Sequence, residues 1–206
     1  MSPRLLTFPF VLLAALGITS PAADTHNVTV QGGVLKIDGH AISSVVKEKA
    51  RNHMSISLKA TTALLGPCDR TDKIKANKFE YQWLPLGLVL REYEGELFCA
   101  GFQFRLPTFA ERPGETEAQR ESRSYVCGMN KTMGQQSTYG GVIVVDGLEI
   151  KNGTHLADIE PTLLKQGYKI DRERNEATAT HPGYELYLTW DEGNDTIRSF
   201  SLLTGP

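Results

Sequence analysis

One hairpin motif occurs twice in the chain, and this repetition restricts the possible folds more than any other feature of the sequence. The run GGVLKIDGHAI begins at Gly32, and the run GGVIVVDGLEI begins at Gly140. In each run an Asp-Gly pair separates two short, mainly apolar stretches. This arrangement is typical of a β-hairpin closed by a type I′ turn.

The segments after the two hairpins also correspond. Residues 57–66 (SLKATTALLG) predict a short helix with a serine cap and a glycine stop. Residues 158–167 (DIEPTLLKQG) predict a second one, with Pro161 in the first turn, where no intrahelical hydrogen bond is lost. Chance similarity of two hairpins is the alternative, but the matched order of elements favours a duplication.

Strand candidates follow each predicted helix. Apolar residues alternate along 79–83, 88–91 and 98–104, and the pattern recurs at the end of the chain. The second copy lacks the polar stretch that the first has between Ser43 and His53. The sequence therefore predicts an α+β fold of two tandem ββαβββ units, each an antiparallel sheet with one helix packed on a face. The alternation predicts six core residues: Leu88, Leu90, Phe102, Leu186, Leu188 and Phe200.

The predicted organisation is a signal peptide (1–22), a first unit (27–105), a charged and polar linker (106–138) and a second unit (139–206). A short basic start and an apolar run from Leu5 to Ile18 precede the small residues Ser20 and Ala22. This pattern indicates cleavage after Ala22, with Ala23 as the near alternative. A retained anchor or a buried core helix is the other interpretation, but the apolar run is shorter than a membrane span requires, and its flanks match a signal peptide. We expect a periplasmic or secreted protein that keeps no integral membrane segment after cleavage.

Charge and cysteine content limit the possible partners and bonds. The chain has 22 basic and 24 acidic residues, which argues against a nucleic-acid partner. The three cysteines are Cys68, Cys99 and Cys127, and an oxidising compartment favours one disulfide with one spare thiol. Three pairings are possible. We favour Cys99–Cys127, because both are expected to lie outside the helix-facing core.

No catalytic, metal or cofactor motif occurs in the sequence. The five histidines form neither H-x-x-x-H nor H-E-x-x-H, and there is no C-x-x-C or G-x-S-x-G. Cys68 follows a predicted helix end, where the helix dipole opposes a thiolate nucleophile. We therefore expect no enzyme activity and no cofactor. Four N-x-T sequons, beginning at Asn27, Asn130, Asn152 and Asn194, would mark surface positions in a eukaryotic host, but we favour a bacterial one.

The outward positions of the predicted strands supply the candidate binding residues. Side chains alternate across a strand, so those next to the inward leucines face away from the core. Tyrosine and arginine often anchor protein interfaces. The candidate partner-binding residues are Arg91, Tyr93, Glu185, Tyr187 and Asp191. The charged linker is the second candidate surface.

Four stretches carry a family resemblance: Val34–Gly39, Leu64–Arg70, Tyr81–Trp83 and Leu86–Leu88. Together they resemble a loosely defined group of small secreted bacterial proteins of unassigned function with duplicated sheet-plus-helix units. Some proteins of this kind serve as periplasmic immunity partners that neutralise toxins. The resemblance implies a protein-binding protein, with an immunity protein as the leading hypothesis. The alternatives are a structural or assembly factor of the cell envelope and a hydrolase whose site is assembled from distant residues.

Overall fold

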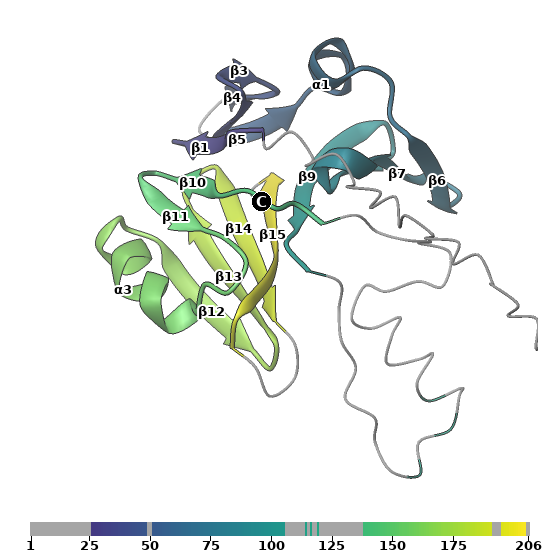
Figure 1. Ribbon diagram of the computed structural model, residues 1–206. Helices are drawn as coiled ribbons and strands as arrows, with labels where there is room; N and C mark the ends of the chain where they lie inside the picture. Colours follow the sequence, from purple (N-terminus) through teal and green to yellow (C-terminus); the bar gives the residue numbers. More distant parts are fainter. Residues whose placement is uncertain are drawn as a thin grey trace, which may run out of the picture.

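The computed structural model describes residues 26–48, 51–105, 138–190 and 195–204, together with Gly114, Thr116 and Gln119. The predicted signal peptide and most of the predicted linker lie outside these residues. The described chain is an α+β fold with two α-helices and three sheets, of eight, five and two strands (Figure 1).

The first segment, 27–105, contains nine strands and one α-helix. A hairpin and three further strands come before the helix: β1 (Val28–Gln31), β2 (Val34–Ile37), β3 (His40–Ala41), β4 (Ser43–Glu48) and β5 (Arg51–Ile56). The helix and four strands follow, with a 3-10 turn at Leu84–Leu86: α1 (Leu58–Leu65), β6 (Arg70–Lys75), β7 (Lys78–Trp83), β8 (Leu88–Tyr93) and β9 (Glu96–Gln103).

The second segment, 139–206, has a hairpin, a helix and four strands. These elements are β10 (Ile143–Val145), β11 (Leu148–Ile150), α3 (Leu156–Lys165), β12 (Lys169–Glu173), β13 (Glu176–His181), β14 (Tyr184–Trp190) and β15 (Ile197–Thr204). Each helix is thus followed by four strands, and the expectation of three was wrong. The additional strands, β6 and β12, lie at the two edges of the large sheet, where most of their residues are charged and no apolar alternation marks them.

The large sheet is antiparallel throughout and joins the two segments. Its strand order is β12-β13-β14-β15-β9-β8-β7-β6, so β9 and β15 meet in the middle (Figure 1). One row of paired residues crosses the middle of the sheet: Leu88, Phe102, Phe200 and Leu188. All six predicted core residues are at most 1% exposed, which confirms the predicted strand phase.

The small sheet has the order β11-β10-β1-β2-β3, and it places β1 beside β10 in a parallel pair. Both of its Asp-Gly turns have positive φ at each position, with Asp38 at 51° and Asp146 at 47°. A type I′ turn requires this geometry, which aspartate and glycine tolerate best. Both predicted hairpins are therefore confirmed.

The helices agree with the sequence in one case and differ in the other. In α1, the Ser57 Oγ accepts a hydrogen bond from the Ala60 N–H at 3.1 Å, and Gly66 follows with φ 81°, as predicted. Helix α3 begins at Leu156, before the predicted start, so Pro161 lies inside it and not in its first turn. The earlier start lets α3 bury Leu156 and Ile159 in the core.

Candidate interaction surface

The large sheet has one apolar face and one polar face. The small sheet, the two helices and the apolar face of the large sheet contribute to one continuous hydrophobic core. The opposite face alternates with these core residues, and we call it the polar face. It includes Arg70 and Asp72 (β6), Glu80 and Gln82 (β7), Val89, Arg91 and Tyr93 (β8), Cys99 and Gly101 (β9), Ser199 and Ser201 (β15), Glu185, Tyr187 and Thr189 (β14) and Glu176 (β13).

A row of charged and polar side chains lies in the first-segment half of the polar face. Glu80, Arg91 and Cys99 are opposite one another on β7, β8 and β9. The Arg91 Nε donates a hydrogen bond of 2.7 Å to the Glu80 Oε1. The Glu80 side chain is only 4% exposed, and its other oxygen, Oε2, is buried with no hydrogen-bond donor among the described residues. The carboxylate thus has spare accepting capacity next to Arg91.

Cys99 lies at the centre of this face and has no disulfide partner among the described residues. Burial raises the pKa of the Cys99 thiol, although Arg91 and Ser201, which hydrogen-bond to it, act in the opposite direction. The thiol is therefore kept protonated and poorly reactive. Its predicted disulfide partner, Cys127, lies outside the described residues, so that pairing stays a prediction.

The second-segment half of the face is also tied by cross-strand hydrogen bonds. The Tyr187 hydroxyl donates to Glu176 on the neighbouring strand. Burial, followed by this contact with Glu176, raises the pKa of Tyr187 above its ordinary value. The Thr189 and Ser199 hydroxyls lie 2.6 Å apart, and the Thr180 hydroxyl donates to Glu185 at 3.3 Å. These bonds restrain the rotamers of side chains that face outward.

Hydrogen bonds and ion pairs between polar side chains also occur at the β6 edge of the sheet. The Arg70 Nε lies 2.7 Å from a carboxylate oxygen of Asp72. The Gln82 Nε2 donates to the same oxygen of Asp72 at 3.2 Å, and the Gln82 side chain is buried. Polar cross-strand contacts therefore extend from the β6 edge of the sheet to β13.

The structure places four of the five predicted partner-binding residues on this single face. Arg91 and Tyr93 are on β8, and Glu185 and Tyr187 are on β14, about 14 Å away across three strand spacings. Tyr93 is the most prominent of them, with 55% of its surface exposed. The fifth, Asp191, lies outside the described residues.

Sequence reasoning did not include the acidic and amide residues of β6 and β7 in this surface. Asp72, Glu80 and Gln82 occupy the outward positions there. A signal was present, because Glu80 and Gln82 alternate with Phe79, Tyr81 and Trp83. The alternation identifies the face of each side chain, but it does not show that Glu80 pairs with Arg91.

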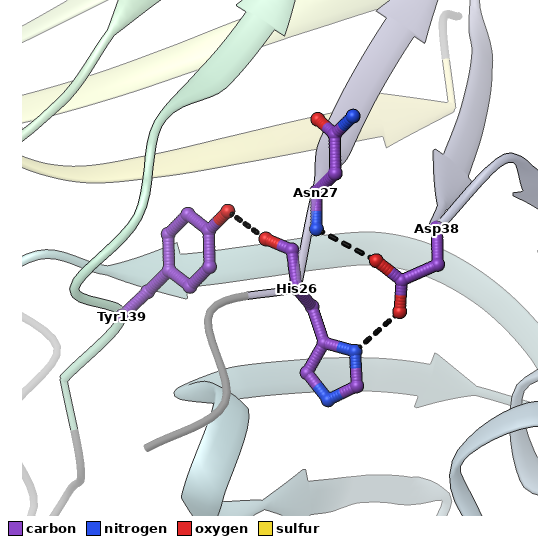
Figure 2. A network of polar contacts seen from close by, with 4 residues as sticks. All are labelled: His26, Asn27, Asp38 and Tyr139. Carbon is purple, nitrogen blue, oxygen red and sulfur yellow. Dashed lines mark hydrogen bonds and ion pairs between the residues drawn. The ribbon is translucent and has the colours of Figure 1, made fainter. Parts of the chain in front are cut away.

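A separate polar network holds the N-terminal strand in the small sheet (Figure 2). The His26 Nδ1 lies 2.5 Å from the Asp38 Oδ2, and the Asn27 N–H donates to the Asp38 Oδ1 at 2.8 Å. The hydrogen bond with His26 is the main reason that the pKa of Asp38 lies below its usual value. The Tyr139 hydroxyl donates to the His26 carbonyl at 2.7 Å. These contacts fix β1 against both segments, so we interpret the network as structural.

The second Asp-Gly turn has a more deeply buried network. Asp146 Oδ1 accepts from the Gly32 N–H at 2.8 Å, whereas its Oδ2 accepts from the Tyr168 and Tyr184 hydroxyls at 2.8 and 2.9 Å. Burial raises the pKa of Tyr184 to about 12. Asp146 thus links the first segment, through Gly32, to two buried tyrosines of the second.

Comparisons with protein-family models, with curated proteins and with solved structures find no match to this chain. Among the described residues, no cluster of three or more His, Cys, Asp and Glu side chains is placed to hold a metal ion. No helix in the described part of the chain is long and apolar enough to cross a membrane.

Proposed function

We propose that the chain is an exported, non-enzymatic protein-binding protein and that a protein partner docks on the polar face of the large sheet. The observation that carries this proposal is the continuity of that face across both segments, with outward side chains already restrained by cross-strand hydrogen bonds. Side chains ordered before binding lose less conformational entropy when a partner docks.

The composition of the face supports a protein partner. It carries both signs of charge, two tyrosines and two arginines, and its arginines lie in paired contacts with carboxylates. Tyrosine and arginine are enriched at protein interfaces, and a mixed charge pattern contributes to specificity for a complementary surface. We therefore propose a folded protein with a complementary mixed-charge surface as the partner.

Within this class we place an immunity protein first, since the family resemblance and the signal-peptide pattern at residues 1–22 both support a binding role outside the cytoplasm. We also propose that the two segments are tandem copies of one unit. The support is their common order of hairpin, helix and four strands. A duplicated unit that joins its sheets edge to edge would create one face wide enough for a protein partner.

Site-specific photo-crosslinking in the native host tests the docking surface. A photoreactive residue at Tyr93 should crosslink a defined partner, whereas the same residue at Leu164, which is 53% exposed on α3, should not. Tyr93→Ala and Tyr187→Ala should weaken binding of that purified partner, and Leu164→Ala should leave it unchanged. Equal crosslinking from both positions, or full affinity in both tyrosine variants, would refute this surface.

A further inference from the structure

The strands β4 and β5 form a two-stranded ribbon that has no counterpart among the described strands of the second segment. The ribbon departs from the small sheet at Ile42, whose N–H donates to the Leu35 carbonyl and whose carbonyl accepts from the Ser57 N–H. Ser43 is still held against β2, because its Oγ accepts from the Leu35 N–H at 2.8 Å. From Ser44 to Lys47 every residue is exposed, including Val45 (41%) and Val46 (36%).

The free edge of β4 differs from the other edges of the described sheets. The large sheet ends in β6 and β12, whose sequences RTDKIK and KIDRE are mostly charged. The small sheet ends in β3 and β11, which have two and three residues. Charge and shortness are the usual protections against unwanted strand pairing. Strand β4 has six residues, pairs only with β5 among the described strands, and presents two adjacent valines.

The backbone groups that face this free edge can be identified. Val45 is opposite Met54 in the ribbon, and the Met54 N–H donates away from β4, to the Gly183 carbonyl at 3.0 Å. In an antiparallel pair, opposite residues either bond to each other or both point away from each other. The N–H and C=O of Val45 therefore point to the free edge, and those of Lys47, two residues further on, do as well.

We propose that this edge binds a second copy of the chain by antiparallel pairing of the two β4 strands. Because Ser43 is held against β2, we choose the register that does not use Ser43. In this register Val46 of one chain lies opposite Val46 of the second copy. Val45 of each chain then exchanges both backbone hydrogen bonds with Lys47 of the other. The two Val46 side chains meet at the non-hydrogen-bonded position, where cross-strand side chains approach most closely.

The charges of the strand are compatible with this arrangement. Lys47 of each chain lies opposite the uncharged Val45 of the other, so these two cations do not face each other. Because the same segment serves both chains, the contact is a closed two-fold interface and forms a dimer instead of a filament. The proposal is independent of the polar face, which belongs to a different sheet.

Sedimentation velocity over a range of concentrations tests the dimer with a matched pair of variants. Val45→Pro removes an N–H that points to the free edge and costs no bond between β4 and β5. Val45→Thr keeps that N–H and the β-branched shape. The full chain and Val45→Thr should dimerise with similar constants, whereas Val45→Pro should weaken dimerisation by about tenfold or more, as expected when interface hydrogen bonds are lost.

A second variant keeps the test independent of proline strain. Val46→Lys would place two ammonium groups opposite each other and should weaken the dimer, whereas Val46→Thr should not. Circular dichroism checks that each variant is folded. A full chain that stays monomeric at the highest concentration overturns the proposal, and so does a dimer unaffected by Val45→Pro and Val46→Lys. A dimer lost only in Tyr93→Ala would place the second copy on the polar face instead.

Discussion

Replacement of Asp146 by alanine should destabilise the protein far more than the same replacement of Asp38. Both aspartates occupy the same position of a type I′ turn, at φ 47° and 51°, so the backbone strain that alanine adds is common to both variants. The two aspartates differ in the hydrogen bonds and the exposure of their carboxylates. Asp146 accepts three hydrogen bonds, two of them from tyrosines that are 3% and 2% exposed, whereas the Asp38 side chain is 43% exposed.

The magnitude follows from these contacts. A hydrogen bond to a charged acceptor contributes about 1.5–3 kcal/mol. The Tyr168 and Tyr184 hydroxyls lie 2.7 Å apart and can bond to each other once the carboxylate is removed, so the loss of their two bonds to Asp146 is less than additive. Including about 1 kcal/mol for alanine at positive φ, we expect Asp146→Ala to lower the free energy of unfolding by about 3–5 kcal/mol. That is a large share of the ~5–15 kcal/mol typical of a native protein.

Urea unfolding followed by tryptophan fluorescence and by circular dichroism measures this difference. Asp146→Asn is the matched control, because asparagine tolerates positive φ, keeps an acceptor for the Gly32 N–H and can donate to a tyrosine oxygen. Its loss should be about 1 kcal/mol. Equal unfolding midpoints for Asp146→Ala and Asp38→Ala would refute the reasoning, since it assigns the excess to the buried tyrosine contacts.

Three further predictions follow from the core, the tyrosines and the N-terminus. Phe102→Ala and Phe200→Ala should each cost about 3–5 kcal/mol in thermal or urea unfolding, because both rings are at most 1% exposed, and unchanged melting would contradict the strand phase. The pKa of Tyr81, Tyr139 and Tyr184 is raised to about 12. Tyrosine in the unfolded chain ionises at about pH 10. Below that pH the protonated phenols contribute their full stabilisation, and this stabilisation should be lost as the pH rises through the folded-state pKa of about 12. Phenolate absorbance during alkaline titration checks this, and ionisation of every tyrosine near pH 10 in the folded protein would contradict it. Mass spectrometry of the exported protein should find Ala23 or Asp24 at the N-terminus, and an intact Met1 on a membrane-bound product would contradict cleavage.

The sequence predicted best those elements whose residues favour a single local structure. An Asp-Gly pair between apolar runs specifies a tight hairpin, and both turns adopt it. Alternation with a period of two identified the buried face of β8, β9, β14 and β15, because one side of these strands packs in the core.

The elements that the sequence did not predict lack such a signal. Strands β6 and β12 are edge strands with little to bury, so neither face is marked by apolar residues. The ribbon was interpreted as a polar stretch, since its residues from Ser44 to Lys47 are exposed on both faces. The start of α3 was placed too late because a proline favours the first turn, whereas tertiary burial of Leu156 and Ile159 extends the helix.

The candidate site could be predicted only in part for a related reason. Alternation along one strand shows which way Arg91 and Tyr187 point, and both lie on the polar face. It does not show which strand lies beside β8. The contact of Glu80 with Arg91 exists because β7 pairs with β8 in one register. Such contacts depend on pairing between strands, so a side chain such as Glu80 is recognised as part of the surface only in the folded sheet.

The two surfaces that carry our proposals differ in how they arise from the fold. The polar face uses the strands that follow the helix in each segment, and the two sets of strands meet at β9 and β15. Its specificity must then come from individual side chains such as Tyr93 and Tyr187. Among the described residues the ribbon occurs only in the first segment, and the exposed side chains of Val45 and Val46 do not belong to the core. An exposed pair of valines on an unpaired strand edge carries a risk of aggregation, so its presence is best explained if the edge is paired in the assembled protein.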